Sequence, residues 1–167
     1  MKKEIKYDLA TYRSLPYETR RAPREALDFV NVERGLTQIF ADLGGLEVDR
    51  EIFRHAIPQH QKDGYGVRLF RVAPGSETDV CKIELTVWGR SGNHDELRRN
   101  MSRMALRLPL NNELVQNDLV SPVIFSAIFL TEPISFSPRY ENAQAQTEGV
   151  LLAEAWVLTL PESFLTS

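Results

Sequence analysis

The chain has 167 residues, enough for one domain that buries about 70% of the surface exposed by its unfolded form. Its net charge of −3 argues against nucleic acid as a bulk electrostatic partner. The single cysteine excludes an intramolecular disulfide framework, and the most apolar run, 123–130, is much shorter than the roughly 20 residues of a membrane helix.

The N-terminal part of the chain is predicted to be a basic arm. No apolar segment follows its first lysines, so we expect no signal peptide and a protein made in a reducing cytosol. Residues 1–24 hold seven Lys or Arg against three Asp or Glu, whereas the remainder holds thirteen against twenty. This asymmetry predicts an arm over 1–30 that contacts an acidic surface, and a single folded domain over 31–167.

Two helices are predicted next. Asn31 is a candidate N-cap, and apolar residues at helical spacing from Val32 to Leu43 are followed by the terminating pair Gly44-Gly45. A second, short helix before Pro58 is predicted from the residues Val48, Ile52, Phe53 and Ala56. Residues 57–66 are predicted to be a loop.

A β-hairpin follows, with strands over 67–72 and 80–88 and a turn over 73–76. The second strand alternates, with one apolar side formed by Cys81, Ile83, Leu85 and Val87. Cys81 is therefore expected to be buried and inert. Trp88 stands on the polar side, where another loop of the chain or a partner would cover it.

The next element is a helix that starts after Asn93, a predicted N-cap with Glu96 in the capping-box position. Its apolar stripe is formed by Leu97, Met101, Met104, Ala105 and Leu108. Pro109 ends it. Four arginines lie off the stripe and form either a solvated face or a site for phosphate or an acidic partner: Arg98, Arg99, Arg103 and Arg107.

The C-terminal third is predicted to contain two strands. Residues 110–121 are read as a polar connector, 123–130 as a central strand buried on both faces, 131–148 as a long polar loop, and 149–160 as a last strand. The fold class is thus α+β: a mostly antiparallel sheet of about four main strands with helices packed on one face, plus the arm. The strands predicted over 123–130 and 149–160 are apolar on both faces. The face of the sheet without helices therefore needs a cover as well, which the arm or a neighbouring subunit would supply.

No catalytic, cofactor or metal motif is found. His55 and His60 are five residues apart, the wrong spacing for one helix face; Asp49 and Glu51 nearby leave only a weak metal site. No phosphate-binding loop, dinucleotide fingerprint or nucleophile elbow occurs, and no local arrangement links Ser, His and Asp. We therefore expect no enzyme activity, no cofactor and no metal.

In size and element order, the chain resembles the tail terminator proteins of tailed phages, and neck or tail-completion proteins generally. The resemblance rests on the helix at 36–43, the hairpin, the turn and helix after Gly89, and the strands after Pro122 and Gly149. It implies a structural virion protein without an active site, forming a homohexameric ring that caps the tail tube and contacts the head connector. The implied partners are further copies, the tail tube protein and the head-tail connector protein, with assembly in the host cytoplasm and neither membrane nor sequence-specific nucleic acid as a partner.

Candidate interface residues were chosen by type and position: Arg20, Arg21, Arg24, Trp88, Phe136, Arg139 and Tyr140. Two other classes of function remain open at this point. One is a small α+β enzyme or ligand-binding domain with a pocket near His55, His60 and Tyr65, and the other is a monomeric regulatory adaptor. Particle size separates them, because a ring is several times larger than a monomer or dimer.

Overall fold

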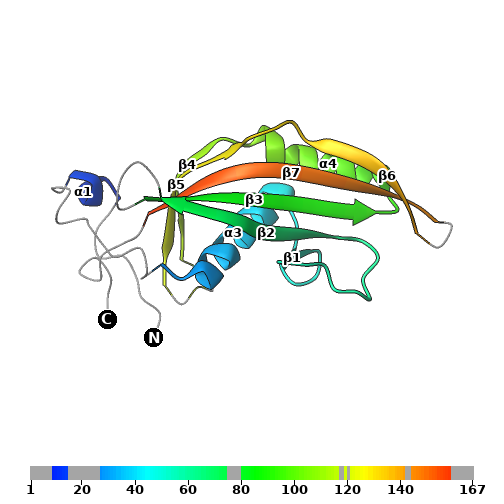
Figure 1. Cartoon of the computed structure of the whole chain (residues 1–167), viewed down its shortest axis with the longest axis horizontal. Coiled ribbons are helices and arrows are strands. Elements are labelled where there is room, and N and C mark those ends of the chain that lie inside the picture. Colours follow the sequence, from blue (N-terminus) through cyan, green and yellow to red (C-terminus); the bar gives the residue numbers. More distant parts are fainter. Residues whose placement is uncertain are drawn as a thin grey trace.

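The structure is a computed structural model that describes residues 9–14, 27–74, 80–116, 119, 121–141 and 144–158. It is α+β, with helices α1 (Leu9–Ser14), α3 (Phe29–Gly44) and α4 (His94–Leu106) and one seven-stranded sheet (Figure 1). The strands are β1 (Ile52–Arg54), β2 (Gly64–Pro74), β3 (Val80–Ser91), β4 (Leu110–Val115), β5 (Val123–Leu130), β6 (Ser135–Glu141) and β7 (Gln144–Leu158). Of the helices in the described ranges, none combines the length and apolarity that crossing a membrane requires.

The sheet is organised around β7. Its order is β1-β2-β3-β7-β5-β4, with β6 also paired to β7, and every strand pair except β1–β2 is antiparallel. β3 lies along one edge of β7, while β5 and β6 follow one another along the other edge. Figure 1 shows β7 running the length of the sheet. The sheet has more strands than the four predicted.

Helix α3 is capped at both ends as its sequence allows. Asp28, not Asn31, is the N-cap, because its Oδ1 accepts from the N–H groups of Val30 and Asn31. Asn31 is instead buried in the first turn, where its side-chain amide donates to the carbonyl of Ser121 over 2.6 Å. At the other end Gly45 takes a left-handed φ of 68°, the conformation in which glycine ends helices most easily.

Helix α4 has the predicted N-cap and stripe but ends at Leu106, so that Leu108 lies beyond it and Pro109 does not end it directly. Asn93 Oδ1 accepts from the backbone N–H of Glu96 over 3.2 Å, and Leu97, Met101 and Met104 are fully buried in the core. Ala105 and Leu108 are half-buried against the same core. The apolar stripe therefore packs as its spacing indicates.

A pair of glycines lets α4 approach the sheet closely. Gly89 of β3 and Gly149 of β7 are directly opposite one another. A Cβ atom at Gly89 would lie 2.7 Å from Tyr65 Cδ1 and 2.8 Å from Leu97 Cδ1, and one at Gly149 would collide with the sulfur of Met101. The two glycines form a shallow hollow that holds side chains of the core.

Strand β3 has the predicted alternation, and it extends to Ser91 rather than Trp88. Ile83, Leu85 and Val87 are completely buried on the side of the helices, and Cys81 is 4% exposed. The intervening residues are half-buried on the other side. This confirms the predicted assignment of the two faces.

We expect the thiol of Cys81 to react slowly with a thiol reagent in the native protein and rapidly in denaturant, because reagent must reach a sulfur that is covered in the folded state. Labelling followed by mass spectrometry measures both rates. Similar rates in the two conditions would contradict the burial of this strand face.

The predicted short helix around 48–56 is wrong. Ile52, Phe53 and Arg54 form strand β1, which pairs in parallel with Tyr65, Gly66 and Val67 of β2. The chain turns before β1 because the carbonyl of Glu47 accepts three successive N–H groups, those of residues 50–52. Here tertiary pairing overrides a weak helical spacing.

Two predicted connectors are strands instead. The segment 110–121 contains β4, a largely polar strand that pairs with β5 and, among the described residues, with no other strand. The loop predicted over 131–148 contains β6 and the first residues of β7, which pair as a hairpin from Ser135↔Val150 to Glu141↔Gln144. Both segments lack a strong apolar alternation, so the sequence pattern did not reveal them.

Candidate functional site

One face of the sheet is covered by neither α3 nor α4. On this face, Trp88 of β3 is opposite Val150 of β7, and the following positions on the same side of β7 are Leu152, Glu154 and Trp156. Phe129 of β5 meets Trp156 edge-on, with ring centroids 6.2 Å apart. The five half-buried apolar side chains among these residues, called here the outer strip, lie across three strands of the sheet, with Glu154 between Leu152 and Trp156 on β7.

Trp88 is partly covered by its own chain. Its cross-strand neighbour on β2 is Gly66, and a Cβ atom there would lie 2.7 Å from the indole nitrogen. The guanidinium of Arg90 lies 6.0 Å from the ring centroid, within the range of a cation–π contact. The residue predicted to need a cover thus lies over a glycine and remains half-exposed on the outer strip.

Charged residues at one end of the same face pair with one another. Arg71 Nε lies 3.5 Å from Glu84 Oε2, and Lys82 Nζ lies 3.0 Å from Glu154 Oε1. Such partly exposed pairs contribute at most about 1 kcal/mol each to stability. They leave this part of the face nearly neutral, which lowers the cost of burying it beneath another protein.

Three of the four α4 arginines are engaged within the molecule. Arg107 Nη1 donates to the carbonyl of Leu43 over 3.1 Å, close to the C-terminus of α3, where a positive charge is favourable. Arg103 lies beside Gly45 at the same helix end. The guanidinium of Arg98 lies 5.1 Å from the ring centroid of Phe136. All four arginine side chains are exposed, which fits the predicted solvated face.

The other predicted interface residues are dispersed. Phe136 is half-buried against the core on the side of the helices, opposite to the side of Trp88. Arg139 and Tyr140 belong to β6, and the structure describes only their backbone. Arg20, Arg21 and Arg24 lie outside the described residues.

The residues of the predicted ligand pocket do not come together. Tyr65 is buried beneath α4, where its hydroxyl accepts from Asn100 Nδ2 over 3.0 Å, whereas His55 and His60 are both exposed. Two cavities among the described residues, one beside Arg34 and Arg54 and the other beside Arg71 and Lys82, are lined by none of the three. In the same part of the chain, no group of three or more His, Cys, Asp or Glu is placed to hold a metal ion.

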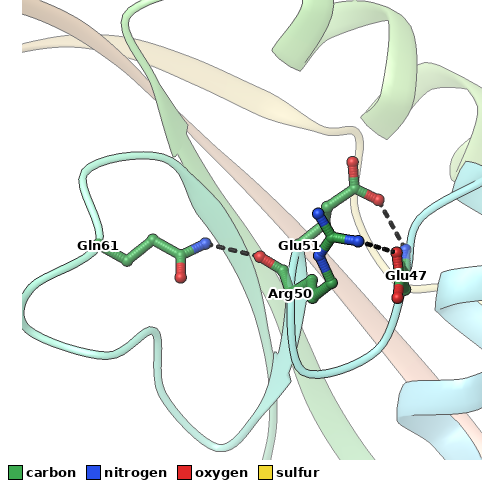
Figure 2. A network of polar contacts seen from close by, with 4 residues as sticks. All are labelled: Glu47, Arg50, Glu51 and Gln61. Carbon is green, nitrogen blue, oxygen red and sulfur yellow. Dashed lines mark hydrogen bonds and ion pairs between the residues drawn. The ribbon is translucent and has the colours of Figure 1, made fainter.

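The segment before and after β1 is held by its own polar contacts (Figure 2). The backbone N–H of Glu47 donates to Glu51 Oε2 over 2.7 Å, and Arg50 Nη1 lies 3.1 Å from Glu47 Oε2. Gln61 Nε2 donates to the carbonyl of Arg50 over 2.8 Å. These contacts link the residues that precede β1 to one another and to Gln61 in the loop that follows it.

Burial raises the pKa of the Tyr65 hydroxyl, whereas the hydrogen bond from Asn100 lowers it. The negative charges of Glu96, Glu51 and Asp63 raise this pKa further. The unfolded state then loses this proton at a lower pH than the folded state does. The stability that depends on neutral Tyr65 is therefore complete below the ordinary pKa of about 10 and is lost as the pH rises through the folded-state value.

We expect the folded protein to form Tyr65 phenolate only above that pH, and its free energy of unfolding to fall in the same range. Ultraviolet difference absorbance and urea unfolding measure the two effects. Tyr65→Phe is the control, because it lacks the ionisable group. An equal fall in stability for both proteins above pH 10 would assign the effect to other groups.

A scan of the sequence against protein families finds no match, and a comparison with curated proteins finds none either. Solved structures do match, among them a chain described as "Virion of native gene transfer agent (GTA) particle". It is 14% identical, covers 77% of this chain and 95% of that chain, and superposes with a TM-score of 0.44. A similarity of this size establishes neither a family nor a function.

Sequence reasoning located Trp88 on the outer face but missed most of the outer strip. Leu152 and Trp156 were assigned to a strand that is apolar on both faces, which indicates two covers but not what supplies them. Phe129 was placed in a strand of the same kind. The apolar residues on both faces of β5 and β7 indicated an apolar outer face. Only the pairing of these strands with each other and with β3 shows that the residues lie side by side.

Proposed function

We propose that the protein is a structural component of the neck or tail of a phage virion. In this proposal it forms a homohexameric ring that caps the tail tube and joins it to the head connector, and it carries out no chemistry. Its partners are further copies, the tail tube protein and the connector protein. The basic arm, predicted over 1–30, contacts a neighbour, and the body, predicted over 31–167, includes the whole of α3 from Phe29.

The observation that carries the proposal is the outer strip. A largely apolar strip over three strands that neither α3 nor α4 covers is suited to protein contact, and aromatic residues are enriched at such interfaces. The charged residues beside it are already paired with one another, and burying paired charges beneath another protein costs less free energy than burying unpaired ones. The observed elements also include the helix, the hairpin, the capped helix and the late strands on which the resemblance to tail terminators rests.

The proposal is tested by particle size and shape. Multi-angle light scattering on the eluting protein should give a mass several times 19.1 kDa, and images of negatively stained particles should show rings. The double variant Trp88→Ser and Leu152→Ser should weaken association while leaving the circular dichroism spectrum unchanged. A monomer at every soluble concentration would contradict the ring.

A further inference from the structure

Part of one sheet edge is paired with no strand among the described residues. β2 pairs with β3 along its whole length, but β1 pairs with the other side of β2 only at Tyr65, Gly66 and Val67. From Arg68 to Pro74, no described strand lies on that side. An exposed edge of this length presents unpaired backbone groups to any strand that approaches it.

The side chains of this β2 edge are apolar and basic. Phe70 and Val72 are each 47% exposed. A register shift between Leu69 and Arg71 leaves Phe70 without a partner on β3, and bulges of this kind often redirect a side chain. Arg71 is 75% exposed, with only a 3.5 Å contact to Glu84, and Arg68 makes no ion pair with a described residue.

The opposite edge of the sheet has the complementary character. β4 is paired on one side with β5 and on the other side with no described strand. Leu114 of β4 is 47% exposed, and Glu113 makes no ion pair with a described residue. No Lys or Arg occurs between Leu110 and Val115, so this edge is apolar and acidic. The edge of β6 is less suitable, because Pro138 in its middle lacks an N–H group.

We propose that the 68–74 edge of one copy docks against the β4 edge of the next copy. Arg68 and Arg71 would then face Glu113, and Phe70 and Val72 would face Leu114. The two edges are of similar length, with seven residues on β2 and six on β4. Because they are different surfaces of the same chain, repeated docking adds copies in one direction, and it closes into a ring when the rotation allows.

We expect side-chain contacts to stabilise this interface more than backbone hydrogen bonds between the two edge strands do. The irregularity at Phe70 interrupts one edge, and Asn112 with its left-handed φ of 55° interrupts the other. The inference rests on the proposed ring, since it names the two surfaces by which neighbouring copies would meet.

A double-cysteine experiment tests the pairing. In the variant Val72→Cys with Leu114→Cys, mild oxidation should produce a ladder of covalent multimers, because each copy would be linked to the next. Either single variant should remain monomeric under denaturing, non-reducing electrophoresis, and native Cys81 adds little background because it is buried. The matched control is Val72→Cys with Leu106→Cys, which places the second thiol at a more exposed site on α4. Dimers from a single variant, or a ladder from the control, would overturn the assignment.

Charge exchange gives an independent measurement. Arg68→Glu or Glu113→Arg alone should weaken association by about tenfold, and the two changes in one chain should restore most of it, since the attraction is re-formed with its signs reversed. If the natural chain forms rings that neither variant weakens and no ladder appears, the edge pairing is wrong and the ring stands. If the natural chain is a monomer at every soluble concentration, the ring itself is wrong, and this inference fails with it.

Discussion

Replacing Met101 with aspartate should unfold the protein. Met101 is fully buried in the middle of α4, with its sulfur against Gly149 of β7. A carboxylate there would have no described cation within the core, and burying an unpaired charge costs several kcal/mol or more. Because a domain of this size is stable by only about 5–15 kcal/mol, the change removes most or all of its stability.

The matched control is Arg99→Ala. Arg99 is two residues away on the same helix and is exposed; changes at such positions are usually within about 0.5 kcal/mol. Urea unfolding followed by circular dichroism compares the two variants. If both lose stability equally, the register of α4 against the sheet is wrong.

Replacing Gly89 with valine should destabilise the protein substantially. The new Cβ would lie 2.7 Å from Tyr65 Cδ1 and 2.8 Å from Leu97 Cδ1, and both of these side chains are buried. Since neither the ring of Tyr65 nor the isobutyl group of Leu97 can move into solvent, α4 must shift away from the sheet. Overpacking of this kind costs typically about 1–3 kcal/mol, which corresponds to a melting temperature lower by roughly 2–12 °C.

Gly92→Ala provides the comparison, because a Cβ atom at Gly92 meets nothing within 4 Å. It should change the melting temperature little, and it separates the steric effect from the general loss of a glycine near the start of α4. A Gly89 variant as stable as the Gly92 variant would show that α4 does not lie as closely on β3 as described.

The parts of the fold that the sequence predicted well are those with a strong periodic pattern. The stripe from Leu97 to Met104 and the alternation from Cys81 to Val87 each place many apolar residues on one side, and tertiary packing uses both. The N-cap at Asn93 was also predicted correctly because capping depends on residues near in sequence.

The missed elements are stabilised by partners distant in sequence. β1 is a strand because Ile52 and Phe53 pair with β2, and β4 is a strand because β5 lies beside it. Neither segment has a pattern that distinguishes it from a loop or a short helix. β6 was missed for a similar reason, since its polar residues form a strand through pairing with the extension of β7.

The candidate surface was predictable only in part. The exposure of an aromatic residue at Trp88 followed from simple alternation, and this residue does lie on the outer face. Phe136 was chosen by residue type, yet it lies on the helix side beside Arg98. The exposure of Phe70 depends on a local irregularity in the β2–β3 pairing, which no residue in that segment signals.

Strand β7 gives the molecule a mechanical direction. Its 15 residues span roughly 50 Å, and neighbouring strands accompany it on both edges. Antiparallel hydrogen bonds run perpendicular to the strands, so tension applied along β7 loads many of them in shear at once. Tension applied across the sheet would instead open them one after another. The protein should therefore resist stretching along β7 far better than peeling at the β4 or β1 edge.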